Sequence, residues 1–253
     1  MMCIRKYMAM MFLALLCTVT PAGAQSLVSQ ANEAYRNGDY ARAVELYEQS
    51  GEQDGTSAAY FYNLGNAYYK SGLYPRAILN YERALLLDPG NDDVRFNLEM
   101  AQARIADKIE PLGTFFLDQW FTTLRNLFSS NVWAVIAVVA FLIFLAGGVV
   151  YFFVDRVVWR KIGFFAGLLA LLITIGANRF ASVQKQQLTR RESAIVFAPT
   201  IIAKSSPSES GTDLFVLHEG TKVYIVDRVG EWSEIRLEDG NRGWIPTDRL
   251  EVI

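Results

Sequence analysis

The chain has 253 residues, enough for one or two ordinary domains. It is 52% hydrophobic and only 20% charged, which is apolar for a water-soluble protein and points to membrane segments. The formal net charge of -2 supplies no global field that would attract nucleic acid, so we expect no nucleic-acid partner.

Residues 1–24 predict a secretory signal peptide. Arg5 and Lys6 form a positive segment, residues 8–19 form an apolar stretch too short to span a bilayer, and residues 22–24 form a small-residue cleavage site. The mature chain would begin at the next residue, a glutamine.

The competing interpretation of the N-terminus is a lipoprotein signal at Cys17. It is disfavoured because Leu16 stands where a small residue is needed. Both cysteines, Cys3 and Cys17, lie inside the predicted signal. We therefore expect the mature chain to have no disulfide, no thiolate catalysis and no cysteine zinc site.

Residues 25–110 contain an internal repeat. Its period, 72 − 38 = 34 residues, is the length of a tetratricopeptide (TPR) unit, a pair of antiparallel helices. We expect two TPR units and then a capping helix, because Asn97 continues the register of Asn63 at 97 − 63 = 34 residues. Small Gly65 would let the paired helices approach closely. The repeated residues are Gly38, Tyr40, Ala43 and Tyr47, which recur as Gly72, Tyr74, Ala77 and Tyr81.

The first helix of each TPR unit is expected to line a concave, peptide-binding groove. An asparagine amide can donate to a ligand carbonyl and accept from its amide, so Asn63 and Asn97 could hold an extended backbone. The alternative is that these are helix-surface residues with local partners. Binding of a chaperone's C-terminal tail is disfavoured, because Val28 and Asp93 stand where clamp lysines are needed. The candidate residues are Asn32, Tyr35, Arg36, Tyr62, Asn63, Asn66, Tyr69, Lys70 and Asn97.

Residues 114–130 predict an amphipathic helix rich in aromatic residues. Phe116, Trp120 and Phe121 fall on one helical stripe, and polar residues such as Asp118 fall on the other. Such a helix directly before a spanning segment favours a position in the membrane interface. The alternative is a helix packed on the TPR core.

Two apolar segments, residues 132–153 and 162–179, predict a transmembrane hairpin in contact with the lipid bilayer. A short basic turn separates them, and an exported N-terminus would place that turn in the cytoplasm. Apart from Thr174, no mid-membrane residue of the spans could relay a proton or coordinate an ion, which disfavours transport. Gly163 and Gly167 form a GxxxG spacing that could close the hairpin or form a dimer seam.

After a polar connector, residues 184–192, the pattern becomes β-rich over residues 192–253. Short runs separated by Glu219-Gly220, Val229-Gly230 and Asp239-Gly240 predict about five strands and a small barrel. The expected strands are 194–197, 214–217, 223–226, 232–237 and 243–245. A serine-rich stretch, residues 205–210, is expected to form a flexible loop.

Residues 218–253 resemble a bacterial SH3-type (SH3b) domain, through Glu219-Gly220, Trp232 and Gly243-Trp244. Candidate surface residues of this domain are Tyr224, Trp232 and Trp244. The whole order of segments resembles the BatE-type proteins of bacterial aerotolerance operons. That resemblance implies an inner-membrane protein that works with von Willebrand factor A-type partners and a MoxR-type ATPase.

Catalysis is not expected. His218 is the only histidine, it is predicted at a strand end, and no nucleophile or metal motif accompanies it. We thus expect no cofactor and no metal.

The expected fold class is a multi-domain membrane protein with an α-helical TPR solenoid, a transmembrane helical hairpin and a small all-β SH3-like barrel. The leading hypothesis is a scaffold anchored in the bacterial inner membrane as a multi-pass protein, with both soluble domains in the periplasm. The alternative is a cell-wall accessory whose SH3b domain binds peptidoglycan, and an envelope hydrolase ranks last.

Overall fold

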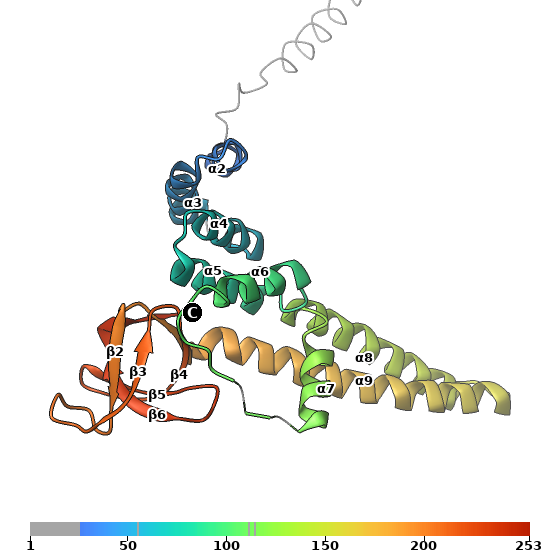
Figure 1. Cartoon of the computed structure of the whole chain (residues 1–253). Helices are drawn as coiled ribbons and strands as arrows, with labels where there is room; N and C mark the ends of the chain where they lie inside the picture. Colours follow the sequence, from blue (N-terminus) through green and yellow to red (C-terminus); the bar gives the residue numbers. More distant parts are fainter. Residues whose placement is uncertain (1–25, 55, 111, 114) are drawn as a thin grey trace, which may run out of the picture. The chain divides into compact units, whose positions relative to one another are not determined.

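The computed structural model describes residues 26–54, 56–110, 112–113 and 115–253 (Figure 1). The predicted signal peptide, residues 1–24, lies outside the described residues. The chain divides into two compact units, residues 1–54 and 55–253.

The first unit contains the helical hairpin of α2 (Leu27–Arg36) and α3 (Tyr40–Asp54). Ser26 begins α2, because its hydroxyl accepts a hydrogen bond from the Ser29 amide at 3.2 Å. Gly38 reverses the chain with φ of +81°, a conformation that other residues adopt at a steric cost. Ala31 and Ala43 are fully buried between the helices, as the repeat predicts.

The second unit begins with α4 (Ala58–Lys70), α5 (Tyr74–Leu87) and α6 (Asp92–Gln102). Gly72 takes the place of Gly38 in the turn, with φ of +77°. A methyl group on Gly65 would lie 2.7 Å from the ring of Tyr81, so the predicted close approach of α4 and α5 is present. Val94 and Leu98 of α6 are buried, and α6 contacts α5 and α4. The helical TPR-like architecture is therefore confirmed.

Helix α7 (Phe116–Arg125) is shorter than the predicted 114–130 segment and buries none of its residues. The chain turns after Arg125, whose carbonyl accepts from Trp133 Nε1 at 2.8 Å and from Gln184 Nε2 at 2.9 Å. Gln184 also donates to the Phe128 carbonyl at 2.9 Å. These bonds satisfy carbonyls at the end of α7 and attach it to the next two helices.

Helices α8 (Ser130–Phe153) and α9 (Val157–Arg190) are long and apolar enough to cross a membrane, with mean hydropathies of 2.7 and 1.7. Only 11% and 17% of their most apolar windows are buried, whereas the core helix of a soluble protein would be mostly covered. The two helices lie side by side (Figure 1). A methyl group on Gly147 would lie 2.7 Å from the Gly163 carbonyl oxygen, so the GxxxG glycines face their own hairpin.

Helix α9 is longer than the predicted span of 162–179. It begins at Val157 and continues to Arg190, so most of the predicted polar connector is helical. The polar Gln184 marks a buried contact rather than a loop, because it is only 3% exposed and bonds to the carbonyls of Arg125 and Phe128, whereas the polar residues 185–187 are exposed helix surface. No glycine or proline occurs between residues 177 and 191 to stop the helix.

The C-terminal part is a seven-stranded antiparallel sheet in the order β3-β2-β6-β5-β4-β1-β7, called the β domain below. One core cluster draws buried residues from β1 through β6, so the sheet wraps around a single core. The strands are β1 (Ser193–Val196), β2 (Thr200–Lys204), β3 (Asp213–His218), β4 (Lys222–Val229), β5 (Trp232–Arg236), β6 (Arg242–Pro246) and β7 (Leu250–Val252).

Five of these strands coincide with the predicted runs, while β2 and β7 were not predicted. The predicted turns at Gly220, Gly230 and Gly240 are present, each with positive φ. The serine-rich stretch, predicted as a loop, lies in the connection from β2 to β3. Strand β7 has only three residues, too few for an alternating pattern, and β2 starts directly after Pro199.

Candidate binding surfaces

In the first unit, two of the three candidate groove residues contact their own hairpin. The Tyr47 hydroxyl donates to Asn32 Oδ1 at 2.5 Å. The rings of Tyr35 and Tyr40 meet edge to face, with centroids 5.4 Å apart. Arg36 is exposed in the last turn of α2, where a cation suits the helix dipole. Asn32 and Tyr35 thus hold the two helices together.

In the second unit, a hydrogen-bonded network joins three helices. The Tyr81 hydroxyl donates to Asn66 Oδ1 at 2.8 Å. Asn97 Nδ2 donates to the same Asn66 oxygen at 2.9 Å and to the Tyr62 hydroxyl at 3.2 Å. The donor group of Asn97 is therefore engaged, so it could donate to a ligand only after releasing α4.

The remaining candidates of α4 differ in how available they are. Tyr69 packs edge to face on Tyr74 at 5.5 Å, which repeats the Tyr35–Tyr40 contact. Asn63 is partly exposed and has no hydrogen-bond partner among the residues that the structure describes, and Lys70 is exposed. Asn63 and Lys70 are the side chains of α4 best able to contact a partner.

The outer face of α6 ends the helical stack. Glu99 stands one repeat after Gly65, at 99 − 65 = 34 residues, and it is exposed. Since a single methyl group at Gly65 would already collide with the Tyr81 ring, a glutamate at this position prevents a further helix from packing as closely as α5 packs on α4. This geometry supports the capping role expected for α6.

The aromatic candidates of the β domain share one face. Cross-strand pairs align Trp232 with Pro246 and Glu234 with Trp244. The alternate residues Ser233, Ile235 and Ile245 are buried. Because successive side chains of a strand point to opposite faces, Trp232 and Trp244 point outward. Trp232 and Trp244 thus lie diagonally on the outer face of β5 and β6.

Tyr224, the third candidate of the β domain, has polar and charged neighbours. It pairs across the sheet with Arg236, whose guanidinium lies 5.0 Å from the ring centroid. Its hydroxyl is 3.4 Å from Glu238, and Lys222 Nζ lies 5.8 Å from the ring. Burial raises the pKa of the Tyr224 hydroxyl, and the two acids Glu238 and Glu82 add to the rise while Lys222 opposes it. Tyr224 belongs to a charged cluster near α5.

An ion pair connects this cluster to α5. Lys222 Nζ lies 2.6 Å from Glu82 Oε2, with side-chain exposures of 23% and 10%. Burial disfavours the charged ammonium, but Glu82, Tyr224 and Glu238 together outweigh burial and raise the pKa of Lys222 above its usual value. Nearby, Arg83 donates to the Val252 carbonyl at 2.8 Å and to Glu251 at 3.1 Å. The second TPR-like hairpin and the β domain are therefore in direct contact.

A second contact involves the only histidine of the chain. The carboxylate of Asp107 accepts from the His218 amide at 2.8 Å and from the Thr221 hydroxyl at 2.6 Å. Its other oxygen lies 2.7 Å from His218 Nδ1. His218 ends β3, as predicted, but the sequence analysis did not identify Asp107, because 111 residues separate the two and no motif links them.

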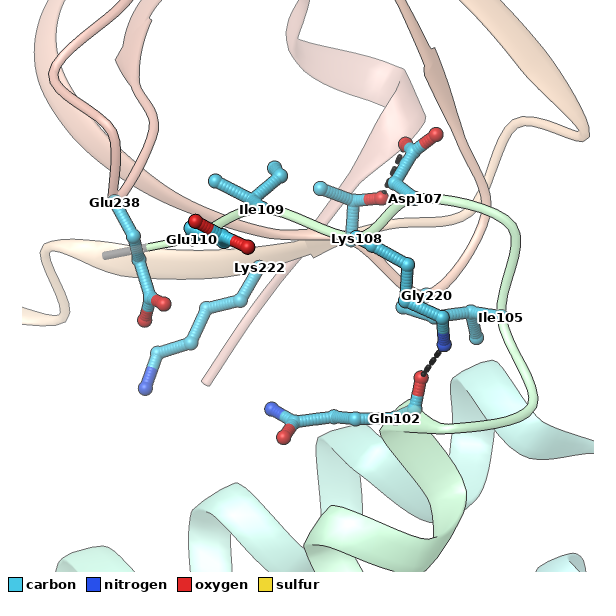
Figure 2. A pocket seen from close by; sticks show the side chains of 10 residues that line it. Gln102, Ile105, Asp107, Lys108, Ile109, Glu110, Gly220, Lys222 and Glu238 are labelled. Carbon is cyan, nitrogen blue, oxygen red and sulfur yellow. Dashed lines mark hydrogen bonds between the residues drawn. The ribbon is translucent and has the colours of Figure 1, made fainter. Parts of the chain in front are cut away.

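The segment that carries Asp107 borders a cavity of about 200 Å³ (Figure 2). Lys222 and Glu238 line it from the β domain, and Gln102 lines it from the end of α6. Lys108 Nζ donates to the Gln102 carbonyl at 2.8 Å across its edge, the lower dashed line in Figure 2. Among the described residues there is no group of three or more His, Cys, Asp or Glu side chains that could hold a metal ion.

Comparison with known families identifies both kinds of module. Residues 28–94 match the tetratricopeptide repeat family, and residues 202–251 match the bacterial SH3 domain family. A search of curated proteins gave no significant match. The chain therefore combines a TPR region and a bacterial SH3 domain, two modules that indicate interaction with protein or peptidoglycan, on either side of two long apolar helices.

Proposed function

We propose that this protein is a membrane-anchored scaffold that binds protein partners through its TPR repeats and its bacterial SH3 domain. The observation that carries the proposal is the order of the modules: the two binding modules flank a pair of helices long and apolar enough to span a bilayer. The proposed role is binding without catalysis, and it needs no cofactor.

The proposed topology places both modules on the same side of the inner membrane, in the periplasm, because two crossings return the chain to the side on which it began. The exposed aromatic face of α7 would lie in the interface of the lipid bilayer. Two modules on one anchor raise the effective concentration of each for a shared partner. A protease added to spheroplasts with an intact inner membrane should therefore remove both modules, and removal of only one would contradict this topology.

The resemblance to BatE-type proteins favours a place in an envelope complex of the aerotolerance kind. The proposed partners are von Willebrand factor A-type membrane proteins, with a MoxR-type ATPase acting on the same complex. The support is the shared order of TPR repeats, hydrophobic pair and terminal bacterial SH3 domain.

Partner binding is tested by crosslinking in native membranes, followed by purification of the full-length chain and mass spectrometry. We expect Asn63→Ala with Lys70→Ala to reduce capture of the partner, because these side chains are the most available on α4. Gln187→Ala with Lys185→Ala is the matched control, since both residues are exposed and belong to α9 rather than to α4. Equal capture by both variants would remove the groove from the proposal.

The outward aromatic pair of the β domain favours a second candidate function, binding of peptidoglycan. Trp232 and Trp244 present apolar ring faces beside polar Glu234 on one surface, an arrangement suited to sugar rings. The full-length protein in detergent should then sediment with purified sacculi, and Trp232→Ala with Trp244→Ala should abolish the effect. Failure of the parent protein to sediment would leave the protein scaffold as the function.

A further inference from the structure

Residues 103–110, called the strap below, leave the end of α6 and lie along the β domain. Exposure alternates along the strap: Ile105, Asp107 and Ile109 are partly buried, whereas Ala106, Lys108 and Glu110 are exposed. Residues 103–106 turn and bend after α6, and residues 107–110 continue outside any helix or strand, so the exposure itself shows which side chains are covered. The strap thus presents Ile105, Asp107 and Ile109 to the β domain, as a bound peptide presents its anchor residues.

The polar anchor of the strap is Asp107. Its carboxylate contacts three groups: the His218 amide and His218 Nδ1 at the end of β3, and the Thr221 hydroxyl in the turn that follows. Thr221 is only 3% exposed, so its hydroxyl is positioned for this one carboxylate. A buried hydroxyl left without an acceptor would be costly, and a single carboxylate accepts from both this hydroxyl and the His218 amide, so an acidic residue suits this position.

The apolar anchors lie on either side of the carboxylate. Ile109 packs against the core cluster of the β domain. Ile105 covers Gly220, where a methyl group would lie 2.6 Å from Ile105 Cγ2. Gly220 also has φ of +89°, so both the turn conformation and the approach of Ile105 require glycine there. The surface for the strap is built from specific residues of the β3–β4 turn.

We propose that the surface formed by His218, Gly220 and Thr221 is a peptide-binding site of the β domain, and that the strap is its internal ligand. Its ligand class is a non-helical segment with the pattern aliphatic-x-acidic-x-aliphatic. A partner segment with this pattern competes with the strap and frees the connection between α6 and α7. The competition by a partner rests on the proposed scaffold function, whereas recognition of the strap itself does not.

The cavity beside the strap indicates what a competing segment can add. It has a volume of about 200 Å³ and is lined by Lys222 and Glu238 next to Ile109 and Glu110. In Figure 2 the side chains of Lys222 and Glu238 both lie in the left part of the view. A competing segment has room there for bulkier side chains than those of the strap.

The test measures binding of a fluorescent peptide with the sequence of residues 103–110 to the full-length protein in nanodiscs. The Asp107→Ala variant releases the strap, and Lys108→Ala is the matched control, because the Lys108 side chain is exposed and its hydrogen bond goes to the Gln102 carbonyl at the end of α6 rather than to the β domain. We expect the peptide to bind Asp107→Ala at least about tenfold more tightly than the parent or Lys108→Ala, since the internal ligand loses its charge-assisted hydrogen bonds.

A second peptide with Asp107 and Lys108 exchanged keeps the composition and moves the acid to the opposite face. It should bind at least about tenfold more weakly than the native peptide. Equal binding of the two peptides, or equal binding of the native peptide to parent and Asp107→Ala, would overturn the proposal.

Hydrogen exchange at the His218 amide provides an independent measurement, and Asp107→Asn serves as a second variant of the same shape. The amide should exchange faster in Asp107→Ala and regain protection when the native peptide is added. Unchanged exchange in both variants would also overturn the site. No partner is used in these experiments, so their failure leaves the scaffold proposal to be decided by co-purification.

Discussion

The hydroxyl of Tyr81 donates a hydrogen bond to Asn66 across the two helices of one TPR-like hairpin. One repeat earlier, Tyr47 donates to Asn32 in the same way, and both pairs are separated by 15 residues. A bond that recurs with the repeat belongs to the construction of each hairpin. Asn32 and Asn66 therefore contribute first to stability, and a ligand would compete with tyrosine for them.

We predict that Tyr81→Phe lowers the free energy of unfolding of the full-length protein by about 1 kcal/mol, the usual effect of losing one partly buried hydrogen bond. The matched control is Tyr74→Phe in the same helix, whose hydroxyl makes no hydrogen bond in the described part of the chain. It should change the free energy by less than about 0.5 kcal/mol. Denaturant unfolding followed by circular dichroism measures both, and equal effects would contradict the role of the Tyr81 hydroxyl.

The glycines of α8 provide a test of the hairpin. A methyl group on Gly147 would lie 2.7 Å from the Gly163 carbonyl oxygen, whereas one on Gly148 would meet nothing within 4 Å. We predict that Gly147→Ala destabilises the α8–α9 pair by about 1–3 kcal/mol, because backbone must move apart. Gly148→Ala should be close to neutral. Thermal unfolding in detergent compares these neighbouring substitutions, and a larger effect at Gly148 would contradict the packing.

The contact between α5 and the β domain depends on a partly buried charge pair. A double-mutant cycle of Lys222→Met and Glu82→Gln should give a coupling free energy of at least about 1 kcal/mol, because each single change leaves its partner poorly solvated. The exposed pair Arg42–Glu45, with side-chain exposures of 52% and 60%, is the control. Its coupling should stay below about 0.5 kcal/mol. Similar values for the two cycles would argue against a stabilising junction.

Asp107 makes the strap sensitive to acid. Burial alone would raise its pKa above the usual 3.8, but the hydrogen bonds from Thr221 and His218 outweigh burial and lower the pKa. A carboxylate with a lowered pKa contributes its full stability above pH 3.8 and loses it as the pH falls through the folded-state pKa. The difference in unfolding free energy between the parent and Asp107→Asn should therefore shrink between pH 5 and pH 3. A constant difference over this range would contradict the assignment.

Local patterns predicted most of the secondary structure because their causes are local. The turn glycines Gly38 and Gly72 have left-handed backbone, and the close approach at Gly65 follows from the repeat. The end of α9 was missed for the opposite reason. Polar side chains around Gln184 resemble a loop in sequence, but in the structure that residue bonds to the carbonyls of Arg125 and Phe128.

The candidate site was less predictable, since its residues come together from distant parts of the chain. Asparagine is a residue type suited to ligand binding, so Asn66 and Asn97 were reasonable candidates from the sequence. Only the fold shows that their side chains hydrogen-bond to each other. Likewise, no sequence motif around Asp107 predicts its contact with His218. The outward face of Trp232 and Trp244 could be anticipated from strand alternation, whereas the charged surroundings of Tyr224 depend on Glu82 of α5.

The uninterrupted length of α9 has a mechanical consequence. Its 34 residues extend about 51 Å at 1.5 Å each, while a bilayer core takes up only about 30 Å. In the proposed topology roughly 20 Å of rigid rod stands clear of the lipid tails. Only Arg191 and Glu192 separate its end from β1. A small change in the tilt of α9 would displace the β domain attached to its end by a larger distance. Lipid thickness or a neighbouring helix could therefore change the position of the β domain.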